Sequence, residues 1–402
     1  MKRFLIFLDI LFFMLIFICT AFAKGVDDSQ LIKGNINFGI KLMNEVRNHE
    51  FDNNVIFSPI GLGQSLSVLS NGAVGSTFDE LNLVQGFNGY RESEINSFWK
   101  NTVSSTPYVY DKKMFIFTRS SLWVQNGFTF NPEFMSTINS FYPGFDLTYI
   151  NFSDKYTPSA INDWVKTSTN HQVTSIVSKK DVSKDTMMYL INITYAKLAW
   201  KNEFPKNLTK KGTFYLSNGQ TAKALYMKTT GNFDYYENDI FQAVKVELAD
   251  PDLEAVFFLP KGTKTLMNIY RNMNGENYFN WSTQFKKRPL MLIIPKMDLE
   301  YKTSFIPEFK GIGVGDPFDQ NYADFKKMFK VANFSFVSNE ISDNFLKVDE
   351  YGLNKTIFNK DIKDVVNFDH PFVMVIANKK TNAWLLIASI ENPHPDEWFE
   401  IF

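Results

Sequence analysis

Apolar residues recur at helical spacing in the first half of the chain, as Phe38, Leu42 and Val46 do along one predicted helix. Proline opens two further helices, at Ser58-Pro59 and Asn131-Pro132, because its fixed backbone angle suits the first helical turn. The predicted helices span residues 32–47, 59–72, 132–141 and 160–170. Thr77 with Glu80 three residues later predicts a capping box for another helix.

Strands predominate from Met187 onward, where apolar and β-branched residues form short runs. The predicted strands span residues 187–199, 212–216, 243–248, 255–259 and 290–295, besides two earlier ones at 55–57 and 120–124. Helices return at residues 266–273 and 304–309. A helix-rich first half followed by a strand-rich second half predicts an α+β fold.

The first residues have the pattern of a secretory signal. Lys2 and Arg3 precede an apolar run, and Ala21-Phe22-Ala23 then supplies the small residues that signal peptidase accepts. We expect a signal peptide at residues 1–23 and a secreted, extracellular protein. A membrane anchor is the alternative, but the run is shorter than the roughly 20 residues that span a bilayer. The only cysteine, Cys19, lies in this segment, so the mature chain would contain no disulfide.

Composition narrows the class of protein further. The chain has 402 residues, of which 45% are hydrophobic and 21% charged, and this balance is typical of a globular protein with a sizeable core. The formal net charge of −1 gives no electrostatic basis for a nucleic-acid or membrane partner, and we expect neither. The 41 phenylalanines are spread along the chain and are interpreted as core residues.

No motif for catalysis or for a cofactor is found. No two of the four histidines have the i, i+4 spacing of a metal-binding helix, and no G-x-S-x-G nucleophile motif occurs. The segment Gly311–Gly315 lacks the G-K-[ST] of a phosphate loop and is followed by Asp316-Pro317, so we interpret it as a turn. The sequence therefore favours a protein that is not an enzyme and has no cofactor or metal.

Six N-x-S/T sequons are possible glycan acceptors in a secreted chain. We expect glycans at exposed sequons among Asn151, Asn207, Asn280, Asn333 and Asn354. The sixth begins at Asn192, inside a predicted buried strand, and we expect it to remain unmodified.

Several segments stand in order along residues 32 to 393. They are Asn54-Val-Ile-Phe-Ser-Pro59, Gly72-Ala-Val-Gly-Ser-Thr77 with Glu80, Ile161-Asn-Asp-Trp-Val165 with Thr169-Asn170, Leu190-Ile-Asn-Ile-Thr-Tyr195 with Lys197, Trp200 and Phe204, Val366-Asn-Phe-Asp-His-Pro-Phe-Val-Met-Val-Ile376, and Glu391-Asn-Pro393. Together they resemble the serpin family; one such match would be weak, but the ordered set is specific.

The resemblance implies one monomeric domain at residues 24–393, with three β-sheets, eight or nine helices and an exposed reactive loop at about 353–369. A tail at residues 394–402 would follow it. In inhibitory serpins a serine protease cleaves this loop and forms an acyl-enzyme. The loop then inserts into the central sheet and distorts the protease. The resemblance places Glu350 and Gly352 at the hinge of the loop, and Ser58, Asn192, Trp200 and Ser342 where the sheet must open.

The hinge of this chain departs from the family pattern of small residues. Counting the first residue after Gly352 as inward places Leu353, Lys355 and Ile357 on the buried face of an inserted strand. An unpaired buried lysine costs on the order of several kcal/mol. Phe358 is also bulky for this position, and a glycan on Asn354 would impede threading between strands.

The loop is also short, which leaves the scissile bond open between two positions. Counted back from His370-Pro371, the bait residue falls at Lys360, followed by Asp361, and predicts a trypsin-like extracellular protease as the partner. Counted forward from Gly352 it falls near Val366, close to the next strand. A further alternative is that Lys360 is only a solvated loop charge.

Beneath the sheet, Gly61 and Ser342 stand where we align the serine and histidine of the family, and we expect hydrogen bonds to be lost there. Two hypotheses remain open. The chain is a secreted serpin that inhibits a serine protease and so controls proteolysis, or it is a non-inhibitory carrier, storage or interaction protein or a reversible, substrate-like binder. No dense basic stripe occurs at residues 94–113 to support activation by heparin.

Overall fold

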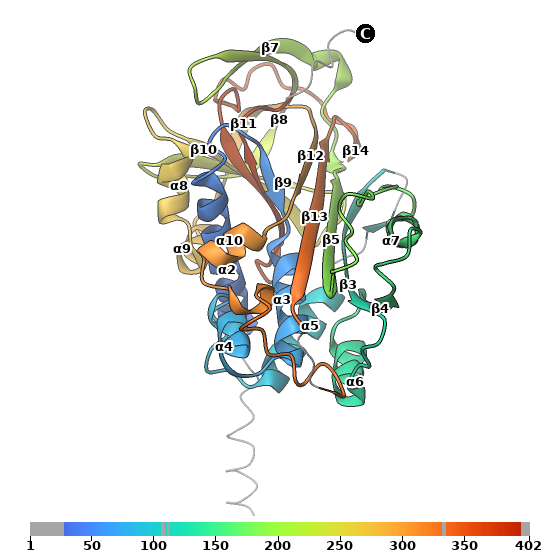
Figure 1. Ribbon diagram of the computed structural model, residues 1–402. Helices are drawn as coiled ribbons and strands as arrows, with labels where there is room; N and C mark the ends of the chain where they lie inside the picture. Colours follow the sequence, from blue (N-terminus) through green and yellow to red (C-terminus); the bar gives the residue numbers. More distant parts are fainter. Residues whose placement is uncertain (1–27, 106–108, 111–112, 332–334, 395–402) are drawn as a thin grey trace, which may run out of the picture.

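The computed structural model describes residues 28–105, 109–110, 113–331 and 335–394 (Figure 1). The predicted signal peptide, the sequon at Asn333 and all of the predicted tail except His394 lie outside the described residues. Within the described ranges the chain forms nine α-helices and three β-sheets, which confirms the predicted α+β fold. Nowhere in these ranges is a helix both long and apolar enough to cross a membrane.

The helices lie mainly in the first half of the chain, as predicted, and their ends agree with the sequence pattern to within a few residues. They are α2 (Asp28–Arg47), α3 (Pro59–Gly72), α4 (Gly75–Leu83), α5 (Glu92–Ser105), α6 (Pro132–Phe141), α7 (Thr157–Ser168), α8 (Leu266–Asn272), α9 (Gly275–Ser282) and α10 (Ile306–Gly311), with 3-10 turns η1 (Lys206–Leu208) and η2 (Asp316–Phe318). Ser58 caps α3 and Asn131 caps α6, each followed by proline at the first helical position.

A six-stranded sheet runs down the front of the molecule in Figure 1. Its order is β12 (Met297–Thr303), β13 (Val337–Val348), β5 (Met188–Lys197), β3 (Phe115–Gln125) and β2 (Val109–Tyr110), with β4 (Phe145–Ile150) also paired to β3. We call it the central sheet. α3 packs against β3 and β5, and nearly every residue of this helix is buried.

A nine-stranded sheet forms the rest of the scaffold. Its order is β1 (Val55–Phe57), β17 (Trp384–Ile390), β16 (Phe372–Asn378), β10 (Leu253–Pro260), β9 (Phe241–Glu247), β8 (Thr221–Glu237), β11 (Lys286–Pro295) and β15 (Val365–Asn367), with β7 (Lys210–Tyr215) paired to β8. The third sheet has two strands, β6 (Trp200–Asn202) and β14 (Gly352–Asn354).

Aromatic side chains fill much of the core, as the phenylalanine content predicts. The Phe257 ring lies 5.3 Å from that of Phe368 and 6.1 Å from that of Phe372, measured between ring centroids. Phe309 stacks on Phe318 at 5.7 Å, where α10 meets η2. Such pairs contribute about 0.5–1.5 kcal/mol each beyond the area they bury.

The predicted capping box at Thr77 and Glu80 is wrong. The N-cap of α4 is Val74, which forms no side-chain capping bond. Thr77 Oγ1 instead accepts a hydrogen bond from the backbone of Asp324 at 3.0 Å. Glu80 Oε2 accepts backbone N–H groups from Gly315 and Asp316 at 2.8 and 2.9 Å. Both side chains therefore bond to backbone groups of distant segments and do not cap α4.

Candidate functional site

The central sheet is closed, because β5 and β13 pair directly in parallel. Their register runs from Val337 opposite Met188 to Lys347 opposite Lys197. The chain leaves β13 at Val348 and does not return between these strands. A strand inserted between them would run antiparallel to both and replace one parallel ladder with two antiparallel ones, which are slightly more stable per residue.

Trp200 fixes the point where the chain leaves the central sheet. Its indole Nε1 donates to the carbonyl oxygen of Asp349 at 2.7 Å, and its backbone N–H donates to that of Tyr351 at 2.9 Å. The Trp200 side chain is completely buried and its ring lies 5.4 Å from that of Phe204. The reversal of the chain after β13 is therefore held by both the backbone and the side chain of one residue.

Glu350 anchors the same reversal through a buried carboxylate. Its Oε2 lies 2.9 Å from Lys296 Nζ, and its Oε1 accepts a hydrogen bond from Thr209 Oγ1 at 2.8 Å. Burial alone would raise the pKa of Glu350, but the Lys296 ammonium and the Thr209 hydroxyl outweigh it and the pKa is lowered. The hinge glutamate is therefore charged and paired at neutral pH.

Gly352 turns the loop onto β6 and away from the central sheet. Gly352 pairs with Trp200, and Asn354 pairs with Asn202, in a parallel ladder. A Cβ atom on Gly352 would lie 2.4 Å from the backbone nitrogen of Glu203, so only glycine fits this approach.

Glu203 holds the next residues of the loop. Lys355 Nζ lies 3.0 Å from Glu203 Oε2, and Thr356 Oγ1 donates to the Glu203 carbonyl oxygen at 2.6 Å. The Asn354 carboxamide donates to the carbonyl oxygen of Lys201 at 2.9 Å. Lys355 is 88% exposed in this arrangement, so the charge that insertion would bury lies in solvent. We call residues 353–360 the proximal arm of the loop.

The end of the proximal arm is a small anchored turn. The Asn359 backbone N–H donates to Thr230 Oγ1 at 2.7 Å, and the Phe358 ring lies 5.5 Å from Lys228 Nζ. Lys360 and Asp361 form an exposed turn, in which Asn359 Oδ1 accepts the Asp361 N–H at 2.9 Å. Lys360 and Asp361 are therefore exposed to solvent, and the loop is anchored both before and after them.

The second proposed scissile position, Val366, lies in a strand. Val366 is the middle residue of β15, pairs in parallel with Leu292 of β11, and is only 2% exposed. Asp364 just before it forms an ion pair with Arg288 at 3.0 Å. A protease cleft needs an accessible segment, so burial disfavours Val366, whereas Lys360 is exposed but would have to leave its turn to become extended.

Asn192 is the centre of a buried polar cluster beneath the central sheet. Its Oδ1 accepts hydrogen bonds from Ser65 Oγ at 2.6 Å and Ser120 Oγ at 2.9 Å. Its Nδ2 donates to Glu340 Oε1 at 3.3 Å, and Ser342 Oγ donates to the same oxygen at 2.5 Å. The cluster joins α3, β3, β5 and β13, the elements that must move apart if the sheet opens.

Glu340 is the residue that sequence reasoning missed. Its Oε2 accepts the backbone N–H of Phe305 at 2.6 Å, so it ties β13 to the start of α10. Burial raises the pKa of Glu340 to about 7, although Ser342, Phe305 and Asn192 each favour the charged form. The sequence contained one signal for this role, the spacing of Glu340 and Ser342. They are two residues apart in one strand and therefore share a face.

The expected loss of a hydrogen bond at Ser342 is wrong, whereas Gly61 has no side chain to form one. Glu340 replaces the missing partner and Ser342 is bonded to it. At Gly61 a Cβ atom would lie 2.4 Å from Thr118 Cγ2, so no larger residue fits there. Ser58 Oγ instead accepts the Gly61 N–H at 3.0 Å.

The sequons differ in accessibility. Asn151, Asn207, Asn280 and Asn354 are exposed, whereas Asn192 is buried and its carboxamide is engaged in the cluster described above. The burial of Asn192 agrees with the prediction that it stays unmodified. Glycosylation at the exposed positions stays a prediction.

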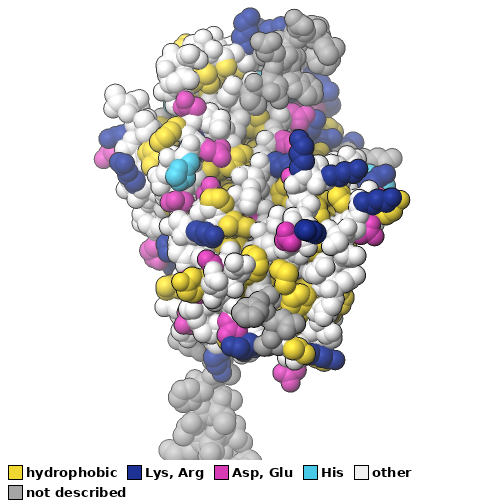
Figure 2. Space-filling view, in the orientation of Figure 1, with side chains coloured by type: hydrophobic (Ala, Val, Ile, Leu, Met, Phe, Trp, Pro, Cys, Tyr) yellow, Lys and Arg dark blue, Asp and Glu magenta, His cyan; other side chains and the backbone are white. Residues whose placement is uncertain are grey.

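Figure 2 shows acidic and basic side chains interspersed over one face of the molecule, with apolar side chains exposed among them. In the described ranges no group of three or more His, Cys, Asp or Glu side chains is placed to hold a metal ion. The candidate site is therefore the anchored loop and the sheet below it.

Comparison with known proteins matches the family model of serpins, described as serine protease inhibitors, over residues 33–393. Human neuroserpin is 24% identical over 89% of this chain and 90% of its own length. Among solved structures, protease nexin-1 with heparin superposes with a TM-score of 0.83 at 22% identity, over 91% of this chain and 100% of the other. Human thyroxine-binding globulin in complex with thyroxine superposes with a TM-score of 0.81 at 20% identity, over 91% and 99%.

Proposed function

Because this chain belongs to the serpin family, we propose that it is a secreted protein that controls extracellular proteolysis by binding a trypsin-like serine protease at Lys360. Binding is reversible and substrate-like, without insertion of the loop into the central sheet. The observation that carries the proposal is the anchored turn, in which the exposed Lys360 lies between β14 and β15. A loop held at both ends loses little entropy when a protease binds it.

The proximal arm is too short for the complete insertion that would trap a protease. If residues 349–352 form the reversal, an inserted strand would place Leu353 beside Val348 and Lys360 beside Ile341. A protease attached at Lys360 would then stop near the level of Asn192, which is opposite Ser342. The remaining rungs of the β5–β13 ladder, from Val337 to Glu340, would stay closed.

The charge of Lys355 opposes insertion as well. In the inserted strand its side chain would leave Glu203 and enter the interior, where an unpaired ammonium costs on the order of several kcal/mol. Gains from the new ladders must exceed this cost before the sheet opens.

Incubation of the purified full chain with trypsin-like proteases tests the proposal. We expect competitive inhibition that is lost on dilution and no complex that survives SDS. Lys360→Ala should weaken inhibition by more than about tenfold, because it removes the cation that enters the specificity pocket. Lys310→Ala, at an exposed lysine on α10, is the matched control and should leave inhibition unchanged. An SDS-stable complex would contradict the reversible mode.

A non-inhibitory role as a carrier, storage or interaction protein is the second candidate. It is favoured by the same two obstacles to insertion, the short arm and Lys355. Simple cleavage after Lys360 with no inhibition of the protease would support it over the first candidate.

A further inference from the structure

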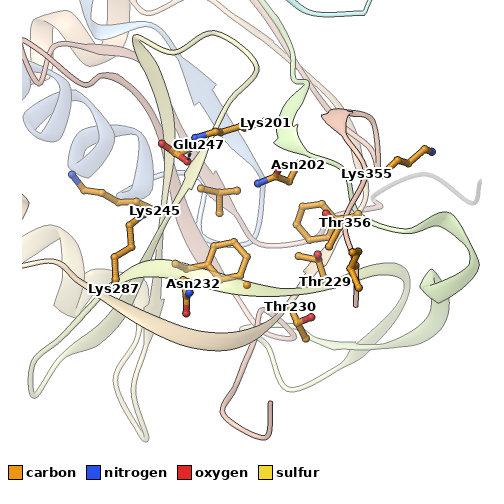
Figure 3. Close-up of a pocket in the computed structure, with 15 residues that line it drawn as sticks. Lys201, Asn202, Thr229, Thr230, Asn232, Lys245, Glu247, Lys287, Lys355 and Thr356 are labelled. Atoms are coloured by element: carbon orange, nitrogen blue, oxygen red, sulfur yellow. Dashed lines mark hydrogen bonds and ion pairs between the residues drawn. The ribbon is translucent and has the colours of Figure 1, made fainter. Parts of the chain in front are cut away.

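A pocket of about 360 Å³ lies beneath the proximal arm, where it meets the nine-stranded sheet (Figure 3). Its walls come from β6, the middle of β8, the end of β9, one residue of β11 and the loop residues 355–357. This volume is within the range of small-molecule sites in proteins, about 300–1,000 Å³. None of the pocket's lining residues belongs to the polar cluster at Asn192, but Thr230 is shared with the anchored turn, since its Oγ1 accepts the Asn359 N–H.

The pocket lining is rich in lysine, and each of its lysines is paired with a carboxylate. Four lysines line it, Lys201, Lys245, Lys287 and Lys355, together with one acid, Glu247. Lys245 is largely buried and paired with Glu254 at 2.8 Å, so it is committed to the fold. Lys201, Lys287 and Lys355 are about half exposed or more, and their pairs with Glu247, Asp234 and Glu203 are surface pairs that contribute at most about 1 kcal/mol each.

Polar groups in the pocket also lack partners. Within the described residues, no hydrogen bond is formed by the side chains of Asn202, Asn232 and Thr229, and Thr229 is only 4% exposed. Figure 3 shows Asn202 and Thr229 on facing sides of the pocket, with Lys245 and Lys287 at one end and Lys355 at the other. The Thr229 hydroxyl opens into the pocket and the Asn202 and Asn232 side chains are exposed, so all three can bond to water or to a ligand.

Apolar groups complete the lining. Phe204, Phe233, Val246 and Ile357 contribute rings and aliphatic carbons between the polar groups. Ile357 is 91% exposed, which is unusual for so apolar a residue and leaves its side chain available to cover an occupant. The lining therefore combines cations at its ends, unused amide and hydroxyl groups, and apolar walls.

We propose that this pocket binds a small amphipathic anion, an aliphatic or aromatic molecule that carries one carboxylate or sulfonate. The anionic group pairs with the Lys287 ammonium group, the apolar body packs between the two phenylalanine rings, and polar substituents bond to Asn202, Asn232 and Thr229. Because Lys355, Thr356 and Ile357 form part of the wall, the bound anion also holds the proximal arm against β6. The proposal does not require protease inhibition, although the pocket shares residues 355–357 with the loop.

The test uses 8-anilinonaphthalene-1-sulfonate as the probe, compared with the uncharged N-phenyl-1-naphthylamine. We expect one probe molecule per chain, and about tenfold weaker binding of the neutral compound, since one charged contact is lost. Lys287→Met should weaken binding of the sulfonate by about three- to tenfold. Lys286→Met is the matched control, because its side chain points to the opposite face of β11 and should have no effect.

Two further measurements make the outcome decisive. Asn232→Trp should fill the pocket and abolish binding while the melting temperature stays unchanged. Hydrogen exchange of the amides at residues 353–359 should slow when the sulfonate is bound, by linkage between the loop and the site. Equal affinity for the charged and neutral probes in all variants, or exchange in the loop unaffected by saturating probe, would overturn the proposal.

Discussion

Lys355 and Glu203 form an ion pair, with 3.0 Å between Nζ and Oε2, that lies on the outer surface of the hinge. An exposed pair of this kind contributes at most about 1 kcal/mol. Insertion of the loop would break this pair, because the same lysine would then face the interior of the central sheet. The native position of the hinge is therefore favoured by the ion pair and also by the free-energy cost of burying Lys355 in an inserted strand.

The hydroxyl of Thr356 should restrain the proximal arm measurably. Thr356→Val removes the 2.6 Å hydrogen bond to the Glu203 carbonyl oxygen. Limited proteolysis with subtilisin should then cleave residues 353–360 about fivefold faster, since one such bond is worth about 1 kcal/mol. Thr283→Val removes a similar hydroxyl-to-carbonyl bond, to Asn280, at the end of α9 and should not change the rate. Equal rates in both variants would contradict the anchoring role.

The buried cluster at Asn192 should make stability depend on pH. Burial raises the pKa of Glu340 to about 7, above the ordinary value of 4.5, so the folded state favours the protonated form. This contribution to stability is complete below pH 4.5 and is lost as the pH rises through 7. Asp343, whose pKa burial also raises to about 7, acts in the same direction.

Glu340→Gln tests that dependence because it keeps most of the hydrogen bonds and removes the titration. The free energy of unfolding of the wild type should decrease between pH 5 and 8. In the variant this decrease should be smaller, by roughly 3 kcal/mol at most. Urea denaturation at several pH values measures it. Glu276→Gln, at an exposed position, is the control. A variant that retains the full slope would show that Glu340 does not titrate in this range.

The ion pair of Arg47 and Glu391 should be the most sensitive stabilising contact outside the loop. Both side chains are buried, and Arg47 also donates to the carbonyl oxygen of Asn53 at 2.8 Å. Arg47→Met leaves the Glu391 carboxylate buried without a partner and should cost about 3–5 kcal/mol of unfolding free energy. The double variant Arg47→Met, Glu391→Gln should recover part of that loss. A cost below about 1 kcal/mol for the single variant would contradict the buried pairing.

Much of the fold could be predicted because local signals and tertiary contacts agree. The α3 helix has a serine cap, a proline at its first position and apolar residues at Leu62, Leu66 and Leu69. β5 was predicted as a continuous apolar strand within two residues of its ends. These elements contain the ordered motifs on which the family resemblance was founded.

Other features depend on contacts between distant segments and could not be predicted. The Thr77 and Glu80 pattern was taken for a cap, but both side chains bind backbone groups more than two hundred residues away. Glu340 acquires its role only when α10 brings the Phe305 N–H to it. β14 is a strand only because β6 lies beside it, and no periodicity occurs in three residues.

A gain-of-function variant should convert the loop to an inserting one. We expect that Lys355→Ala, combined with six additional small residues after Asn359, lets the arm reach Val337 and produces an SDS-stable complex with trypsin. The same six-residue addition with Lys355 retained is the control and should produce less complex, because the buried charge remains. Equal yields from both would show that the length of the arm, and not Lys355, limits insertion.

The proposed mode of binding requires that the native loop does not insert, and the melting temperature of the cleaved protein measures insertion. The chain is cut once after Lys360, and calorimetry compares cut and intact protein. We expect a change of no more than about 2 °C, since no new strand joins the central sheet. An increase of more than about 10 °C would mean that the proximal arm has inserted, which is incompatible with reversible, substrate-like binding.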